Sequence, residues 1–443
     1  MVSKGECTMR RSLSIVLILS VTALLSGCTK VVSTNPDGAY SVQQTKDGGF
    51  ILCGLKTDNN IYKVFLIKTD ISGKKIWERT FNGLGFGCWA FSVQQTMDDG
   101  YILAGTTETS NASLDGYFIK TNSEGNAEWS KVLGSAGDDG IQSIRQTKDE
   151  GYIFTGFSRP QGAGSDKIWL VKTDVNGNVL WEKRLGSSMP VSSQVVLQTK
   201  DGGYIITGYI DSYNGMGNAL LIKTDANGNI LWSKDFGGQS FDAAYSSDLT
   251  DDGGYIIAGP TWSYGAGKAD VWLIKTDAYG NEQWNKTFGR TGSEIAYSVQ
   301  LTSDAGYILA GVSYSYGDNY GDVLLIKTDT NGNEQWYKTY RGTGEGAAMS
   351  LDQARDGGYI IAGYTSSSVA GDNEVLLIKI DANGNKVWEE TFGGTNNEEI
   401  ISMDPTSGYI LAGFTYSFGA GSNDFWLIKT AVEGNAPATS TPG

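Results

Sequence analysis

The residues best suited to chemistry are carboxylates that recur at one position of an internal repeat. Each lies four residues before the serine of a segment similar to Ser-Val-Gln, and Glu345 lies one position out of this register. The residues at the position are Asp37, Asp139, Asp242, Glu294 and Glu398. Carboxylate oxygens are hard ligands, so a ring of them predicts a bound cation, with Ca²⁺ as the first candidate.

Two other roles are open for these carboxylates. They can accept hydrogen bonds from loop backbone N–H groups or from the inner serine. Pairs of carboxylates also catalyse glycoside hydrolysis, so a glycan hydrolase would use Asp139, Asp242, Glu294 or Glu398. Because the position is repeated, no single pair stands out as catalytic. We therefore expect no catalysis and keep glycan hydrolysis as the alternative.

The composition excludes several other classes of protein. The sequence contains no histidine, which excludes Ser-His-Asp and Cys-His catalysis and His-ligated metals. The net charge is −15, and an acidic surface repels phosphate backbones, so we expect no nucleic-acid partner. Cys53 and Cys88 would make one possible disulfide pair, which alone does not indicate a disulfide scaffold.

Aromatic side chains form a second candidate site. They follow the repeated Tyr-Ile-x-x-Gly segment, in loops that are long and differ between repeats. The residues are Trp262, Tyr264, Tyr314, Tyr316, Tyr320, Tyr416 and Phe418, with Tyr213 in an earlier loop. Exposed aromatic rings among glycines suit stacking on sugars or contact with a protein partner. Local packing over the neighbouring strands is the alternative.

These candidate residues must be positioned by a repeat of about fifty residues. The lysine of its Leu-Ile-Lys-Thr-Asp-like segment recurs at intervals of 50 to 52 residues. The eight copies are Lys68, Lys120, Lys172, Lys223, Lys275, Lys327, Lys379 and Lys429. Eight lysines spread around a ring cannot converge, so we expect solvated or turn-bound structural lysines. Such a period with several short strands is typical of a β-propeller blade.

Hydrophobic patterns predict four strands in each repeat. Segment 297–302 alternates apolar and polar residues, which indicates one buried face. Segments 307–310 and 323–326 are continuously apolar, as expected for strands covered on both faces. Segment 334–340 is charged and amphipathic, like an edge strand. The sequence thus predicts an all-β, eight-bladed β-propeller of four-stranded antiparallel blades, with the first strand innermost and the fourth on the rim.

The two ends of the repeat array predict how the ring closes. The eighth repeat stops at Thr430 without a fourth strand, and a Pro/Ser/Thr-rich tail follows at 433–443. An apolar segment at 31–34 precedes the first repeat, where a fourth strand would lie. We expect this N-terminal strand to close the eighth blade, because an open edge would otherwise remain. The propeller domain would then span residues 28–432.

A tryptophan follows the turn between the third and fourth strands in seven repeats. The segments TDVNGNVLW, ending at Trp181, and TDANGNILW, ending at Trp232, resemble the tryptophan-docking repeats of quinoprotein-type propellers. This resemblance implies that the Asp, the turn Gly and the Trp lock each blade to the next. Eight-bladed relatives include quinone-dependent dehydrogenases and the lipoprotein scaffold of the outer-membrane barrel-assembly machinery. The dehydrogenases carry adjacent cysteines beside the quinone, which this sequence lacks, so we expect no quinone.

The turn before the tryptophan is explained by hairpin geometry. Its clearest copy is Asp-Ala-Asn-Gly-Asn at 225–229, with similar turns at Asp174, Asp329 and Asp381. An Asp followed by Asn and Gly is also found in calcium-binding loops, but the DxDxDG pattern with a distal Glu is absent. Asp can bond its own backbone, and Gly tolerates a positive φ, so we expect a structural turn.

The N-terminal segment predicts export and a lipid anchor. Arg10 and Arg11 precede an apolar run at 13–25 that is too short to span a bilayer. The next residues complete Leu-Ser-Gly-Cys, which resembles a lipobox and implies a signal peptide at 1–27 and lipidation of Cys28. An ordinary signal peptide or an uncleaved membrane anchor is the alternative.

Together these features predict an exported, membrane-anchored β-propeller at the cell surface. We expect a monomer that binds or scaffolds protein or carbohydrate through the face carrying the long, variable loops, since binding residues concentrate on such loops. No cofactor is expected, apart from Ca²⁺ at the recurring carboxylates.

Overall fold

The computed structural model contains strands and no helix among the residues that it describes. The described residues are 37–58, 61–85, 87–109, 113–161, 166–186, 191–210, 216–315, 320–341, 344–354, 356–366, 373–404, 409–418 and 424–430. All of them belong to one compact unit that spans residues 33–443. Within this described part, no helix has the length and hydropathy needed to cross a bilayer.

Several predictions made from the sequence fall outside the described residues. They concern the signal peptide at 1–27, Cys28, the closing strand at 31–34, Tyr213, Tyr316 and the tail at 433–443.

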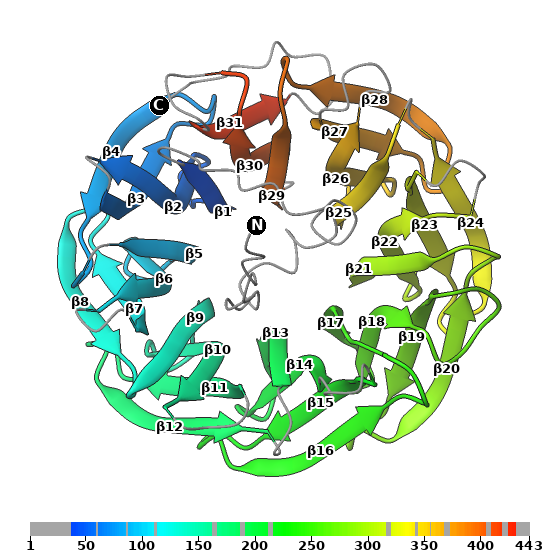
Figure 1. The fold of residues 1–443 in the computed structure, drawn as a ribbon, viewed down its shortest axis with the longest axis horizontal. Coiled ribbons are helices and arrows are strands. Elements are labelled where there is room, and N and C mark those ends of the chain that lie inside the picture. The colour runs from blue at the N-terminus through cyan, green and yellow to red at the C-terminus, as the bar shows by residue number, and fades with distance from the viewer. Residues whose placement is uncertain are drawn as a thin grey trace, which may run out of the picture. The chain divides into compact units, whose positions relative to one another are not determined.

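The strands form eight antiparallel sheets that are arranged as blades around a ring (Figure 1). The innermost strands are β1 (Gly38–Gln44), β5 (Cys88–Gln95), β9 (Gly137–Gln146), β13 (Val191–Gln198), β17 (Ser246–Leu249), β21 (Glu294–Leu301), β25 (Gly346–Gln353) and β29 (Glu398–Asp404). The second strands are β2 (Phe50–Asp58), β6 (Tyr101–Glu108), β10 (Tyr152–Pro160), β14 (Tyr204–Ile210), β18 (Tyr255–Thr261), β22 (Tyr307–Ser313), β26 (Tyr359–Ser366) and β30 (Tyr409–Thr415).

Two further layers of strands complete the blades toward the rim. The third strands are β3 (Ile61–Thr69), β7 (Leu114–Thr121), β11 (Lys167–Thr173), β15 (Asn218–Thr224), β19 (Asp270–Thr276), β23 (Asp322–Thr328), β27 (Asn373–Ile380) and β31 (Asp424–Thr430). The rim strands are β4 (Lys75–Phe81), β8 (Ala127–Leu133), β12 (Val179–Leu185), β16 (Ile230–Phe236), β20 (Glu282–Phe288), β24 (Glu334–Tyr340) and β28 (Lys386–Phe392).

The predicted all-β, eight-bladed propeller is confirmed, with the first strand of each blade innermost and the fourth on the rim (Figure 1). In the eighth blade the described residues supply β29, β30 and β31. The closing of this blade by residues 31–34 stays a prediction.

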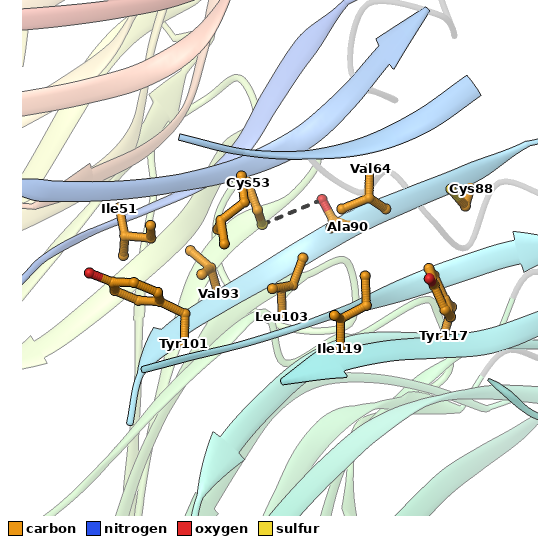
Figure 2. Close-up of a cluster of buried hydrophobic side chains, with 11 residues drawn as sticks. Ile51, Cys53, Val64, Cys88, Ala90, Val93, Tyr101, Leu103, Tyr117 and Ile119 are labelled. Carbon is orange, nitrogen blue, oxygen red and sulfur yellow. Dashed lines mark hydrogen bonds between the residues drawn. The ribbon is translucent and has the colours of Figure 1, made fainter. Parts of the chain in front are cut away.

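The middle strands are apolar because neighbouring blades cover both of their faces. Every residue of β22 and β23 is buried. Figure 2 shows one such interface, where Ile51 and Val64 of the first blade meet Val93, Leu103 and Ile119 of the second. Burying one large aliphatic side chain contributes about 1.5–3 kcal/mol, so each interface stabilises the two blades that form it.

The same packing joins the last blade to the first. Phe65 of β3 and Phe425 of β31 lie with their ring centroids 5.3 Å apart, inside a cluster that also contains Phe50 and Leu427. The Val42 N–H donates to Ser402 Oγ at 3.3 Å across this junction. The ring is therefore closed by a core interface as well as by any shared strand.

The glycine of each Tyr-Ile-x-x-Gly segment permits a close approach of the innermost strand. A bulge there leaves Phe91 unpaired between Ala90 and Ser92. A Cβ on Gly105 would lie 1.9 Å from the Trp89 carbonyl oxygen, so only glycine fits. The bulged residue precedes the repeated serine in most blades.

The repeated serine and glutamine of the innermost strands bond the next blade. Ser41 Oγ accepts from the Val93 N–H at 3.3 Å, and Gln43 Oε1 accepts from the Gln95 N–H at 2.7 Å. Ser92 and Gln94 bond the third blade in the same way. These bonds satisfy backbone groups on an inner edge that would otherwise lack partners.

The recurring tryptophan packs on the turn of the following blade. Trp284 of β20 lies 5.9 Å from Tyr307 between ring centroids. A Cβ on Gly332, whose φ is 74°, would lie 2.5 Å from the Trp284 ring. In the described residues, six of the seven tryptophans contact the next turn glycine in this way, namely Trp77, Trp129, Trp181, Trp232, Trp284 and Trp336.

The turn Asp is structural, as predicted. Asp225 Oδ1 accepts from the N–H groups of Asn227 and Asn229 at 2.9 and 2.8 Å. Its second oxygen accepts from the Asn229 amide at 2.9 Å. The hydrogen bonds lower the pKa of Asp225. Because these groups fill the carboxylate with backbone and amide donors, the turn is stabilised without a metal ligand role.

Candidate functional site

The two faces of the propeller differ in the kind of connection that they carry. The first–second and third–fourth turns are short and uniform, while the second–third and fourth–first loops are longer and vary. The short-turn face holds the recurring lysines. Lys275, for example, is buried and donates to Asp252 Oδ2 at 2.7 Å and to the Thr276 carbonyl at 2.8 Å.

Six further lysines make the same ion pair, so the turn-bound alternative is the right one and the solvated alternative is wrong. The pairs are Lys68–Asp47, Lys120–Asp98, Lys172–Asp149, Lys223–Asp201, Lys327–Asp304 and Lys379–Asp356, at 2.7 to 3.0 Å. Burial alone would raise the pKa of Asp252, but hydrogen bonds from Lys275 and Thr250 outweigh it and lower this pKa to about 2. We assign these residues to the scaffold.

A cavity of about 560 Å³ also opens on this face, between the fifth and sixth blades. Its walls include Asp252, Lys275 and Trp284, which already bond or pack within the scaffold. It therefore offers no free polar group of the kind that a binding site needs.

The recurring carboxylates of the long-loop face are buried loop anchors. Asp242 accepts from the Gly238 N–H at 2.8 Å and from Ser263 Oγ at 2.6 Å. Glu294 accepts from the Arg290 N–H at 2.9 Å and from Ser313 Oγ at 2.7 Å. Each carboxylate thus ties the fourth–first loop to the end of the second strand.

The other members of the set have similar partners. Asp139 accepts from Ser135, Glu398 accepts from Gly394 and Thr415, and Asp37 accepts from Thr57. Asp139, Asp242, Glu294 and Glu398 have no exposed surface. Within the described residues, no three Asp, Glu or Cys side chains form a group that could hold a metal ion. The structure thus places the five carboxylates in separate blades and does not bring them together.

A carboxylate at the start of the third strand approaches some of these anchors, and the sequence analysis missed it. Burial raises the pKa of Asp115, and the charge of Asp139 raises it further. Asp270 and Glu294 form the equivalent pair. One oxygen each of Asp115, Asp139 and Asp270 is buried without a hydrogen-bond partner among the described residues. The recurrence of Asp at the first position of the third strand was the available signal.

The loop aromatics lie on three blades. Trp262 and Tyr264 are 39% and 46% exposed on the fifth blade, and Tyr320 is 56% exposed on the sixth. Tyr416 and Phe418 are 39% and 38% exposed on the eighth blade. These exposed fractions leave contact area for a ligand on each blade.

The alternative of local packing also holds in part for these rings. Tyr264 lies 5.4 Å from Trp272, and Phe418 lies 5.7 Å from Trp426, between ring centroids. Tyr314 is half-buried and donates to Glu345 Oε1 at 3.2 Å. Each ring therefore packs on its own blade with one side and remains open on another, as binding aromatics often do.

Tyrosines also gather on the innermost strands, which the sequence analysis did not foresee. Tyr245 and Tyr297 stack with centroids 6.2 Å apart and planes 7° apart, and Tyr209 lies 6.4 Å from Tyr245. Tyr40 of the first blade packs edge-on to Phe91 at 5.3 Å. Tyr40, Phe91 and Tyr297 are bulge residues, so their shared position before the repeated serine was the signal in the sequence.

The two described cysteines are free and buried. Cys53 Sγ lies 3.7 Å from the Ala90 carbonyl oxygen, and burial raises the pKa of the Cys53 thiol. They fill the core beside β5 and are not linked to each other.

Comparisons with known proteins identify the fold only. No protein-family model matches the sequence. No curated protein matches it. Among solved structures, Sqt1 from Chaetomium thermophilum is similar with a TM-score of 0.54 at 12% identity, over 86% of this chain and 95% of that chain.

A second structure, Chaetomium thermophilum Sqt1 bound to the N-terminus of the ribosomal protein L10, has a TM-score of 0.55 at 12% identity. It covers 85% of this chain and 94% of that one. The Pan2 WD40 domain of Neurospora crassa reaches 0.43 at 12% identity, over 73% and 85%. The chain therefore shares the β-propeller fold with these proteins, and identities this low carry the likeness no further than fold.

Proposed function

We propose that this protein is a non-catalytic binding or scaffolding propeller that recognises a protein partner through its long-loop face. The observation that supports this most is the set of exposed aromatic rings on a rigid ring of blades. Aromatic residues are enriched at protein interfaces because they bury a large area at a small cost in conformational entropy. A carbohydrate ligand is the other candidate for the same rings.

The proposal includes export and anchoring by a lipid on Cys28, in keeping with the lipobox-like segment and the resemblance to tryptophan-docking propellers. An acyl chain would hold the ring at a membrane surface, where its loop face could meet a partner. Substituting Cys28→Ser should move the protein from the membrane fraction to the soluble exported fraction. Retention in membranes with an unprocessed N-terminus would contradict the lipid anchor.

Site-specific photo-crosslinking in the producing cells tests the binding face. A photoreactive phenylalanine analogue at Tyr264 or Tyr320 should give discrete adducts with one protein partner. The matched control is Tyr279, which is 73% exposed in a third–fourth turn on the opposite face. Equal adducts from all three positions, or none, would contradict recognition through the long-loop face.

A glycan screen of the purified protein, with and without Ca²⁺, separates the remaining candidates. We expect no turnover of any glycan. Turnover that is abolished by one of Asp139→Asn, Asp242→Asn, Glu294→Gln or Glu398→Gln would overturn the non-catalytic proposal. Binding that needs Ca²⁺, without turnover, would favour a carbohydrate ligand and a resident cation.

A further inference from the structure

The centre of the ring carries an excess of negative charge. The eight innermost strands contain one basic residue, Arg145, and eight acidic ones. Some of these acids are the buried anchors described above, and others are open to the interior of the ring. The excess means that a cation near the innermost strands would be attracted, because like charges there have little to neutralise them.

Two carboxylates at the centre break the repeat. Glu399 pairs with Phe414, at the position that follows the Tyr-Ile-x-x-Gly glycine. The residues at the equivalent place in the other seven blades carry no charge and are Gly38, Trp89, Gly140, Ser192, Ala243, Ile295 and Ala347. Glu345, one blade earlier, is the carboxylate that departs from the register of the loop anchors. A feature that one blade alone carries is not required to build a blade.

Tyrosines surround both carboxylates. Tyr314 donates to Glu345 at 3.2 Å. After burial, the charges of Glu345 and Glu399 are causes of the raised pKa of Tyr364, which therefore lies near both carboxylates. Glu399 acts in the same way on Tyr416 and, with burial, raises the pKa of Tyr40 to about 12. The group spans blades six, seven, eight and one.

This group has unused binding capacity. Among the described residues, neither Glu345 nor Glu399 forms an ion pair, although many other carboxylates do. The Tyr297 hydroxyl beside Glu345 is buried and has no hydrogen-bond partner in the described part of the chain. Polar groups in such surroundings are usually satisfied, so an absent ligand is a physical explanation for these.

We infer that Glu345 and Glu399, with Tyr297, Tyr364 and Tyr416, form a binding site for an arginine side chain of the protein partner. This deepens the proposed binding function and rests on it. A guanidinium group is planar, so it can stack on a tyrosine ring while its N–H groups donate to carboxylates. Its five donors also match the two carboxylates and the open Tyr297 hydroxyl. A metal ion would need more hard oxygen ligands than this group provides.

Binding of a fluorescent tetra-arginine peptide to the purified propeller, at about 150 mM salt, tests the site. Glu345→Gln and Glu399→Gln should each weaken binding about tenfold, because each removes one charge-assisted contact. The charge-matched control, Glu334→Gln, removes an exposed rim carboxylate and should change binding less than about twofold. Tyr364→Ala should weaken binding, and Tyr364→Phe should retain it, because stacking needs only the ring.

The outcomes separate the arginine site from general attraction to an acidic protein. Equal loss in all three Gln variants, or no binding by the unsubstituted protein, would overturn the inference. Melting temperatures within a few degrees of one another would show that the Gln variants are folded, so a folding defect in Tyr364→Ala leaves the test intact. Crosslinking at Tyr264 and Tyr320 is independent, so the arginine site can fail while the proposed function stands.

Discussion

Seven buried lysines reach the short-turn face and end there on an acceptor-rich turn. Lys275 has four acceptors, namely both Asp252 oxygens, the Thr276 carbonyl and Gln283 Oε1. Burying an ammonium group is costly unless such partners surround it. The aliphatic stem of each lysine meanwhile covers apolar core, so one residue joins the turn to the strands that it connects.

Asp252→Asn should lower the free energy of unfolding by about 1 kcal/mol, because one charge-assisted hydrogen bond is lost at a carboxylate that is half-exposed. The control is Asp251→Asn, which changes the net charge equally at the adjacent exposed position. Chemical denaturation of the three proteins provides the comparison. A larger effect at Asp251 than at Asp252 would show that the ion pair contributes nothing.

The titration of Glu399 gives a second prediction. Burial raises its pKa to about 7, above the value near 4.3 of an unfolded chain. The folded state therefore binds the proton more tightly, and this residue lowers stability progressively as the pH rises from about 4 to about 7. Glu399→Gln should reduce the fall in melting temperature between pH 5 and pH 8, whereas Glu334→Gln should leave it unchanged. The same fall in both variants would contradict a buried, proton-sharing Glu399.

What a residue does could be predicted from the sequence where its position repeats. The Asp of the 225–229 turn and the lysines were correctly assigned to structure, because eight copies around a ring cannot form one site. Glu399 could not be found, since its neighbours Tyr40 and Tyr364 lie in other blades and are far away in the sequence. The bulge that sets its register is also invisible to a simple alternation of apolar and polar residues.

At the scale of strands and turns, the contact between the outer tryptophan and the next turn holds the rim together. The tryptophan covers the turn glycine of the following blade and the tyrosine of its second strand. The turn glycine has a positive φ and no room for a side chain, so two requirements select the same residue. Hairpin geometry and blade contact are therefore specified by one short segment.

Two glycines with similar backbone conformation separate these requirements. Gly332 has a φ of 74° and Trp284 above it, while Gly253 has a φ of 84° and no atom within 4 Å of the place where a Cβ would lie. Gly253→Ala should cost about 1 kcal/mol from the left-handed conformation alone. Gly332→Ala should cost about 2–3 kcal/mol, because the tryptophan must also move. Equal losses in urea denaturation would show that the contact adds no stability.

The prediction of elements from the sequence succeeded where the period was strict. The apolar pairs such as 307–310 and 323–326 are middle strands, and the charged segment 334–340 is the rim strand β24. The long loops resisted prediction, because their aromatics pack on residues such as Trp272 and Trp426 that differ from blade to blade. A loop without a repeated partner leaves no pattern to recognise.

For the molecule as a whole, closure of the ring determines how the blades share stability. The contact of Phe65 with Phe425 joins the first and eighth blades across the ends of the array. A ring in which every blade has two neighbours should unfold more cooperatively than an open array, whose end blades have one neighbour each.

Deleting residues 31–34 should therefore lower the melting temperature and broaden the transition, because the eighth blade would lose its outer strand. Deleting residues 438–441 from the tail removes the same number of residues and should change neither. Calorimetry on the propeller domain provides the measurement. Identical transitions in the two deletions would mean that residues 31–34 do not complete the eighth blade.

The hydrogen bonds between innermost strands all run in one direction around the ring. Side chains of one blade accept, and the backbone of the following blade donates, from Ser41 to Val93 and from Ser402 to Val42 alike. Each blade thus presents one kind of surface ahead and another behind, like the head-to-tail subunits of a cyclic oligomer. Duplicating a whole repeat would create no interface that the chain does not already contain. Ring size is then limited only by the angle at which the last blade meets the first.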